Sequence, residues 1–287
     1  MTQLTRRRFL TISAAIAVAP RMATASTWRG YALGGQAEIT LRGPSDLTRV
    51  ALKAATDTLR RGEALFSLYD PTSTLSQLNR TGHLRPPPPE FHTLLREANN
   101  VHTATNGLFD PTVQSLWQVP NADPSLIDWT RVQIAPDAIT LGAGQAITLN
   151  GIAQGAITDM VTAALRDHGL TDCLVNMGEF AALGGPWTVG IADPLTDVVA
   201  TRRLHNSAIA TSSPLADLRG TAPHIHHPRG GAPLWSTVSV EAPSATRADA
   251  ASTALTLTPL TDFASVKQAL DLTRITAVDF DGNIRTV

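Results

Sequence analysis

Cysteine is almost absent from this sequence, because Cys173 is the only one among 287 residues. A single thiol excludes an intrachain disulfide and any metal site built from several thiolates. Charged residues are also few, at 16% of the chain, and the formal net charge at pH 7 is −1. This balance provides no basic field that would hold nucleic acid, so we expect no nucleic-acid partner.

Two nucleotide-binding patterns are missing as well. No Gly-x-Gly-x-x-Gly segment follows a predicted strand and opens a helix, and no phosphate-binding P-loop is present. A conventional dinucleotide-binding fold is therefore disfavoured. What the chain does have is 43% hydrophobic residues, enough for one sizeable core or for two lobes that share one.

The first 25 residues have the composition of an export signal. A basic cluster at 6–8 precedes a mild apolar run at 11–19, and Ala-Thr-Ala at 23–25 is a small-x-small cleavage site. The apolar run is too short to span a bilayer, and TRRRFL (5–10) matches the twin-arginine type. The alternative is a disordered basic tail. We predict a signal peptide over 1–25, a single mature domain over 26–287, and a periplasmic location.

Hydrophobic periodicity predicts an α+β fold rather than a wound parallel sheet, because strands come in blocks interrupted by helices. An extended proline-rich linker is expected at 85–90, and a final hairpin with an Asp-Gly turn at 275–287. The predicted helices cover 45–66, 90–104, 155–168, 246–255 and 261–271, and the predicted strands cover 36–42, two short segments in 131–149, 172–177, 187–192 and 235–242.

The segment PSATRADAASTAL (243–255) places Asp249 and Thr253 four positions apart among helix-favouring residues. In a helix the two lie on one face, one turn apart, where a carboxylate and a hydroxyl can both offer oxygen to a hard cation such as magnesium. The structural alternative is local. Thr246-x-x-Asp249 fits a capping box, and the Thr253 hydroxyl can bond back to the Asp249 carbonyl. The segment alone does not decide between cation binding and local helix capping.

Three other stretches place candidate residues at predicted turns. Tyr69 either stacks on a planar ring or fills an edge of the core. In Phe109-Asp110-Pro111, a binding role competes with turn formation, because an Asp before Pro is extended and often turn-forming. The glycines of TLNGIAQG (148–155) permit close backbone approach to a ligand, and the N-terminus of the following helix favours an anion.

Histidines gather in APHIHHPRGGAP (222–233), where His224, His226 and His227 are followed by Arg229. Such a cluster can bind a transition metal through alternate residues of an extended segment. It can also supply a general base and phosphate contacts. The third reading is a solvated loop, and the residues alone do not decide among the three.

Taken in order, eight stretches resemble the consecutive motifs of the ApbE family, the FAD:protein FMN transferases. They are FSLYDPTSTLSQLN, GLFDPTVQSLW, TLNGIAQGAITD, LVNMGEFAALG, WTVGIADP, ATSS, HIHHPRGGAP and PSATRADAASTAL. The resemblance extends from about residue 30 to the C-terminus, almost the whole predicted mature chain. It implies the family's T-fold-related α+β architecture, with mixed, largely antiparallel sheets and packed helices.

The resemblance also implies a reaction. Such enzymes bind FAD and Mg²⁺, split the pyrophosphate, attach the FMN half to a Thr or Ser hydroxyl of a target protein, and release AMP. By motif position, Asp249 and Thr253 match the side-chain magnesium ligands, and Gly151 matches the position whose oxygen completes that site. His224 matches the histidine that we expect to assist proton transfer from the acceptor hydroxyl.

Further positions match the family's FAD contacts, and the resemblance also implies a partner. The matching residues are Leu33, Tyr69, Leu108, Phe109, Asp110 and Thr148. The implied partner is a periplasmic or membrane redox protein that carries the acceptor Thr or Ser. The enzyme would then be peripheral to the membrane, through its target.

Three positions depart from the family's pattern. Thr148 and His227 stand where the family has Asp, and Gln154 stands where it has Lys. Together they remove two negative charges and one positive charge, although a protonated His227 could take over part of the cationic role. FMN transfer remains the expected function. The alternatives are an FAD pyrophosphatase that yields FMN and AMP, a non-catalytic flavin-binding assembly protein, and a transition-metal-binding protein that uses the three histidines.

Overall fold

The structure, a computed structural model, describes residues 25–118, 123–216, 218–219 and 222–287. Its helices are α1 (Ser45–Phe66), α2 (Thr74–Thr81), α3 (Pro89–Ala104), α4 (Gln114–Gln118), α5 (Ala153–Asp167), α6 (Ala245–Leu255) and α7 (Phe263–Ala269). The predicted signal peptide falls almost wholly on residues 1–24, which lie outside the described residues. None of the helices in the described part of the chain has the length and apolar content that crossing a lipid bilayer demands.

The largest sheet in the described residues has eight strands, and each neighbouring pair is antiparallel. In spatial order they are β1 (Ala25–Ala32), β2 (Gly35–Arg42), β6 (Cys173–Asn176), β7 (Phe180–Leu183), β10 (Ala208–Ser212), β13 (Thr237–Ala242), β14 (Arg274–Val278) and β15 (Ile284–Thr286). The smaller sheets comprise β3 (His83–Leu84), β5 (Ala138–Thr140) and β4 (Gln133–Ala135), then β8 (Trp187–Asp193) with β9 (Asp197–Leu204), and β11 (Leu218–Arg219) with β12 (Ala222–Pro223). The predicted α+β class is confirmed.

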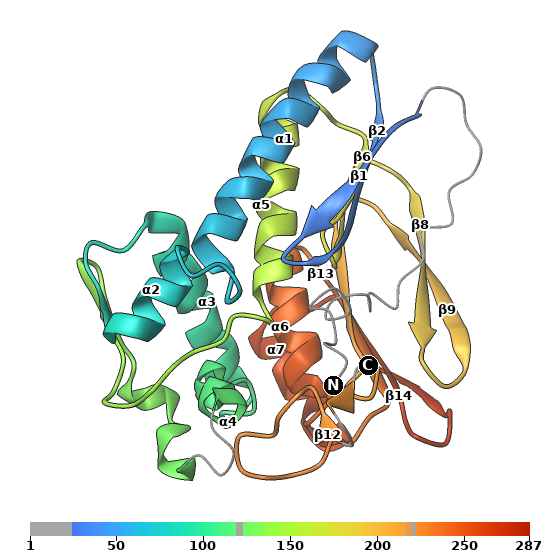
Figure 1. The fold of residues 1–287 in the computed structure, drawn as a ribbon. Helices are drawn as coiled ribbons and strands as arrows, with labels where there is room; N and C mark the ends of the chain where they lie inside the picture. The colour runs from blue at the N-terminus through green and yellow to red at the C-terminus, as the bar shows by residue number, and fades with distance from the viewer. Residues whose placement is uncertain (1–24, 119–122, 217, 220–221) are drawn as a thin grey trace, which may run out of the picture.

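The large sheet separates two hydrophobic cores, because successive side chains of a strand point to opposite faces. In β6, Cys173 and Val175 belong to the larger core, while Leu174 between them belongs to the smaller one. The larger core lies on the side of α1, α5 and α6, and the smaller one packs against β8 and β9 through Trp187 (Figure 1). The sheet thus lies between a helical layer and a hairpin.

Helix α5 packs closely on α6, and a glycine makes this contact possible. A Cβ atom added at Gly155 would lie 2.3 Å from the carbonyl oxygen of Ala245 and 2.8 Å from the Cβ atom of Asp249. Only a residue without a side chain fits there. The contact holds the helix that carries Asp249 and Thr253 against the start of α5.

Most predicted elements are present with small changes at their ends. The helices at 45–66 and 246–255 and the strand at 36–42 are confirmed within a residue. Helix α5 begins two residues earlier than predicted, and α7 is shorter than predicted because residues Leu260–Asp262 form a 3-10 turn. The C-terminal hairpin is present, with a five-residue connection at 279–283 that the Asp279 carboxylate organises through backbone N–H groups. Helix α2 and strands β7, β9 and β10 were not predicted.

Replacing Gly155 with alanine is expected to destabilise the fold, because the new methyl group would meet the backbone of α6. Overpacking of this kind costs about 1–3 kcal/mol. Urea unfolding measures the loss. Gly43→Ala is the matched control, since its Cβ atom would meet its nearest neighbour at 3.4 Å. Equal stability of the two variants would contradict the proposed close approach.

Candidate active site

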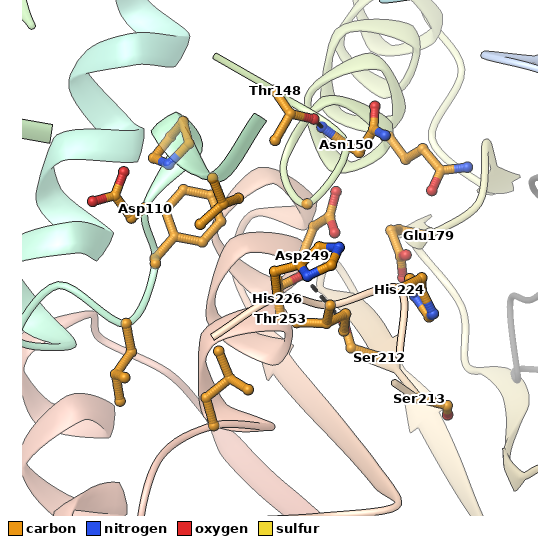
Figure 2. A pocket seen from close by; sticks show the side chains of 18 of the residues that line it. Asp110, Thr148, Asn150, Glu179, Ser212, Ser213, His224, His226, Asp249 and Thr253 are labelled. Carbon is orange, nitrogen blue, oxygen red and sulfur yellow. Dashed lines mark hydrogen bonds between the residues drawn. The ribbon is translucent and has the colours of Figure 1, made fainter. Parts of the chain in front are cut away.

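One pocket gathers residues from segments that lie far apart in the sequence. It is lined by Tyr69, Leu108, Phe109, Asp110, Pro111, Val113, Thr148, Asn150, Gly151, Gln154, Glu179, Thr211, Ser212, Ser213, His224, Ile225, His226, Asp249, Thr253 and Leu257. In Figure 2, Asp249 and Thr253 lie near the middle, with Asp110 on one side and Glu179 and His224 on the other. All the predicted site residues except Leu33 therefore line a single cavity.

The oxygen atoms predicted to hold a cation lie together at the α5–α6 contact. The Asp249 side chain is 3% exposed, and its Oδ2 atom accepts a hydrogen bond of 2.9 Å from the Gly155 N–H. The Thr253 Oγ1 atom lies 2.9 Å from where a Cβ atom of residue 151 would be. Gly151 therefore leaves its backbone next to the Thr253 hydroxyl, as a shared cation site requires.

The capping-box prediction for this helix is wrong. Ser244 is the N-cap of α6, and its hydroxyl accepts from the Arg247 N–H. The predicted hydrogen bond from the Thr253 hydroxyl to the Asp249 carbonyl is not made. The Ser252 hydroxyl donates to that carbonyl instead, at 3.0 Å. The Thr253 hydroxyl lies 3.4 Å from the Ser212 hydroxyl, at the pocket. The Asp249 and Thr253 side chains are thus left facing the cavity.

Asp110, Glu179 and Asp249 are the acidic side chains of the described pocket lining, and the pKa values of the last two are raised. Burial raises the pKa of Asp249 to about 7, against the lowering effect of the Gly155 N–H, and the charge of Asp159 adds to the rise. Burial also raises the pKa of Glu179 well above its usual range, and the Asp249 charge adds to that effect. A cation in the pocket would reverse both shifts, because it stabilises the charged forms.

Glu179 was not singled out in the sequence. Its side chain is 7% exposed, and its Oε2 atom accepts a hydrogen bond of 3.1 Å from the Thr211 N–H. The sequence feature that could have identified it is its position in LVNMGEFAALG, where this carboxylate lies between two buried strands. Charged residues are rarely buried without a partner or a function.

The predicted flavin contacts form one wall of the pocket. Leu108 and Phe109 are buried, while Tyr69 is 55% exposed at the rim and can stack on a ring from outside. The Asp110 carboxylate accepts from the N–H and the hydroxyl of Thr112 and from the Trp129 N–H. Asp110 therefore has a structural role, as its Asp-Pro context also allowed.

Leu33 is the predicted contact that the structure does not bring to the pocket. It lies at the β1–β2 turn with a φ of 48°, and its N–H donates to the Glu63 carboxylate at 3.0 Å. It packs in the larger core and is absent from the pocket lining. Its predicted contact with FAD has no support from this geometry.

Two of the three departures from the family pattern lie in the pocket. The Thr148 hydroxyl accepts from the Asn150 N–H at 3.1 Å and so shapes the turn before Gly151. The Gln154 side chain lies against Gly178, where a Cβ atom would be 2.3 Å from its Nε2 atom. Both positions are thus occupied by neutral side chains.

The histidine loop is divided between the pocket and its surroundings. His224 and His226 line the cavity, whereas His227 and Arg229 do not. Burial and the Arg229 charge lower the pKa of His227, which disfavours the suggested cationic role of a protonated His227. Arg229 donates to the Asn106 carbonyl at 2.8 Å.

The three histidines do not form a transition-metal site. Among the residues that the structure describes, no group of three or more His, Cys, Asp or Glu side chains is arranged to hold a metal ion. The transition-metal reading is therefore disfavoured. The set formed by Asp249, Thr253 and the Gly151 backbone contains only oxygen and suits a hard cation instead.

The fold and the pocket together define an α+β protein whose site combines buried carboxyls with hydroxyl, histidine and aromatic side chains. The family comparison agrees, because the ApbE family model matches residues 33–276. The chain belongs to the ApbE family. No curated protein sequence is similar enough to count as a match.

Solved structures share the fold at low sequence identity. The apo flavinyl transferase ApbE of Pseudomonas stutzeri is 20% identical with a TM-score of 0.78, over 92% of this chain and 94% of that one. The ApbE protein of Thermotoga maritima is 23% identical with a TM-score of 0.79, over 91% and 96%. The flavin transferase ApbE of Vibrio cholerae is 19% identical with a TM-score of 0.78, over 92% and 97%.

The metal-free protein is expected to lose stability as the pH rises from about 4 to about 7. In the unfolded chain, Asp and Glu release their protons near pH 3.8 and 4.5, while folded Asp249 keeps its proton to about pH 7. At the Asp249 and Glu179 carboxyls the folded state binds more protons in this window, so their contribution to the free energy of unfolding falls as the pH rises. Urea unfolding in a chelator at several pH values measures this fall.

Asp249→Asn and Glu179→Gln are the variants that isolate this effect. Neither amide titrates, so each variant should show a flatter pH dependence than the parent chain. Parallel profiles for all three proteins would show that the two carboxyls ionise normally.

Proposed function

We propose that this chain is an FAD:protein FMN transferase, which moves FMN from FAD to a Thr or Ser hydroxyl of a protein acceptor and releases AMP. The observation that carries the proposal is the convergence of nine of the ten predicted site residues on one pocket. These residues come from five separate motifs, so their meeting does not follow from local sequence. The similar structures named as flavin transferases support the same reaction.

The pocket fits a magnesium ion by its charge and its donor atoms. Its lining contains no Lys or Arg in the described part of the chain, but it includes the carboxyls of Asp249 and Glu179. A diphosphate would be repelled by such a site unless a cation lay between them. Asp249, Thr253 and the Gly151 backbone oxygen would hold the ion. Magnesium bound there would neutralise charge on the diphosphate oxygens as AMP leaves.

The chain's own residues then have distinct tasks. His224 lies in the pocket lining, where we assign it as the base that takes the proton from the acceptor hydroxyl. The hydroxyl oxygen bonds to the phosphorus of the FMN half, and the bond from that phosphorus to the AMP oxygen breaks. Tyr69, Leu108 and Phe109 would hold the isoalloxazine ring, since they form the aromatic and apolar wall.

The location and the partner follow from the same proposal. The basic cluster and apolar run at 1–25 support twin-arginine export and a periplasmic location. The acceptor would then be a redox protein of the periplasm or the membrane, and any membrane association would come through it. Only an exposed Thr or Ser of that partner can reach the pocket.

The transfer itself is tested with purified protein, FAD, Mg²⁺ and a Thr-containing flavoprotein acceptor. Intact-protein mass spectrometry should show one added FMN on the acceptor, and AMP should appear in equal amount. Asp249→Ala should lower kcat/KM by at least about 10²-fold, because it removes a charged cation ligand. Free FMN without acceptor labelling would identify a pyrophosphatase, and FAD binding without turnover would identify a non-catalytic protein.

FAD binding is expected to depend on a divalent cation. Without one, the diphosphate would face the buried carboxyls of Asp110, Glu179 and Asp249 and no Lys or Arg side chain from the described lining. We expect chelation to weaken binding by at least about tenfold, or roughly 1.4 kcal/mol. Flavin fluorescence titration with Mg²⁺ or with EDTA measures the change. Riboflavin, which has no phosphate, is the control ligand, and its affinity should not depend on the metal.

A further inference from the structure

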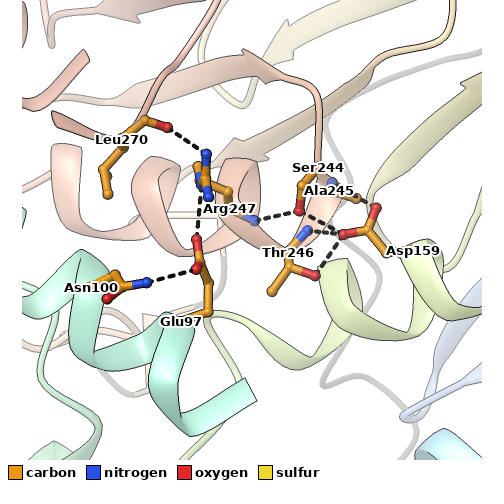
Figure 3. Close-up of polar contacts among 8 residues, drawn as sticks. All are labelled: Glu97, Asn100, Asp159, Ser244, Ala245, Thr246, Arg247 and Leu270. Atoms are coloured by element: carbon orange, nitrogen blue, oxygen red, sulfur yellow. Dashed lines mark hydrogen bonds and ion pairs between the residues drawn. The ribbon is translucent and has the colours of Figure 1, made fainter. Parts of the chain in front are cut away.

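Asp159 of α5 binds the N-terminus of α6 with both carboxylate oxygens (Figure 3). Its Oδ1 atom accepts from the Ala245 N–H at 2.8 Å, and its Oδ2 atom accepts from the Thr246 N–H at 2.9 Å. Oδ2 also accepts from the hydroxyls of Ser244 at 2.7 Å and Thr246 at 2.6 Å. A negative charge at a helix N-terminus complements the helix dipole, so these bonds are strong ones.

This contact is one of three between the 151–159 segment and α6, and successive contacts are four residues apart on each segment. Gly151 lies against Thr253, Gly155 donates to Asp249, and Asp159 binds Ala245. The steps of four residues run in opposite directions on the two segments. The first two contacts belong to the proposed cation site, and the third lies one helical turn beyond it.

A second clamp fixes α6 from the opposite side. The Arg247 guanidinium pairs with the Glu97 carboxylate of α3 at 2.8 Å and donates to the Leu270 carbonyl at 3.0 Å (Figure 3). This pair holds α6 to α3 and α7, whereas Asp159 is the side chain that ties the helix start to α5. The Gly151 loop belongs to the α5 side of the site, so its distance from α6 is set by the Gly155 contact and, one turn beyond, by the Asp159 contact.

We propose that Asp159 is a positioning residue for the cation site. By fixing α6 against α5, it sets the distance between the Gly151 backbone oxygen and the oxygens of Asp249 and Thr253. The inference rests on the magnesium site of the proposed function. Mg²⁺ requires near-octahedral geometry at about 2.0–2.1 Å, whereas Ca²⁺ accepts longer and more variable distances. A small loss of register should therefore harm Mg²⁺ binding more than Ca²⁺ binding.

The test is calorimetric titration of the metal-free protein with Mg²⁺ alone and with Ca²⁺ alone. Asp159→Asn keeps the shape of the side chain but has one acceptor oxygen, so it cannot receive all four bonds. We expect it to weaken Mg²⁺ binding by about 10–100-fold, as removal of a supporting carboxylate does at other metal sites. Ca²⁺ binding should weaken less, so the ratio of the two affinities should shift toward Ca²⁺. Asp159→Ala should shift it further.

Asp193→Asn is the matched control. Asp193 is buried and, like Asp159, accepts from two hydroxyls, those of Ser236 at 2.5 Å and Thr237 at 2.7 Å, but it joins β8 to the start of β13. Its loss should lower the free energy of unfolding without changing the affinity ratio. Urea unfolding of each variant establishes that it is folded at the titration temperature.

The outcomes separate the two claims. If the parent chain binds Mg²⁺, Asp249→Ala abolishes that binding, and both Asp159 variants keep the parent ratio, Asp159 is a structural residue only and the inference is overturned. The inference is equally overturned if Asp193→Asn shifts the ratio as much. If the parent chain binds Mg²⁺ with no dependence on Asp249, the cation site of the proposed function fails instead.

Discussion

The contact between α5 and α6 is the packing interaction on which the site depends. Gly155 lets the two backbones approach so closely that a methyl group would not fit. One helix follows the Gly151 loop, and the other carries Asp249 and Thr253. Because the large sheet and α3 support these helices from behind, the polar atoms meet at a rigid junction rather than on a flexible loop. Such rigidity favours a small ion with strict geometry.

The charge of the pocket depends on the positions where this chain has a neutral residue in place of the charged residue of the family pattern. Thr148, in the turn before α5, and Gln154, in its first turn, are neutral, while the carboxyls of Glu179 and Asp249 remain buried. Burying carboxyls without a nearby cation costs free energy, which appears as their raised pKa values. The metal-free fold is therefore under electrostatic strain at its active site, and a divalent ion would relieve it.

Local patterns in the sequence were sufficient for the amphipathic helix α1, the alternating strand β2, and the face shared by Asp249 and Thr253. Nine of the ten residues selected by the motif resemblance lie in the pocket lining. Contacts between distant segments were not accessible in this way. The capping box was wrong because Asp159, far away in sequence, binds the N-terminus of α6. Glu179 was missed because its significance depends on burial beside Asp249. Helix α2 was missed because its sequence is mostly polar, with only Leu75 and Leu78 buried.

The single thiol of the chain is at the start of β6, where Cys173 has no exposed surface and burial raises its pKa to about 12. A buried thiol with a raised pKa is rarely a thiolate, so we expect it to react slowly with labelling reagents and with disulfides. The native chain should therefore contribute little background in cysteine-labelling experiments. A cysteine introduced at the exposed rim position of Tyr69 would be the one reactive thiol, and a dye attached there would report directly on the arrival of flavin or acceptor.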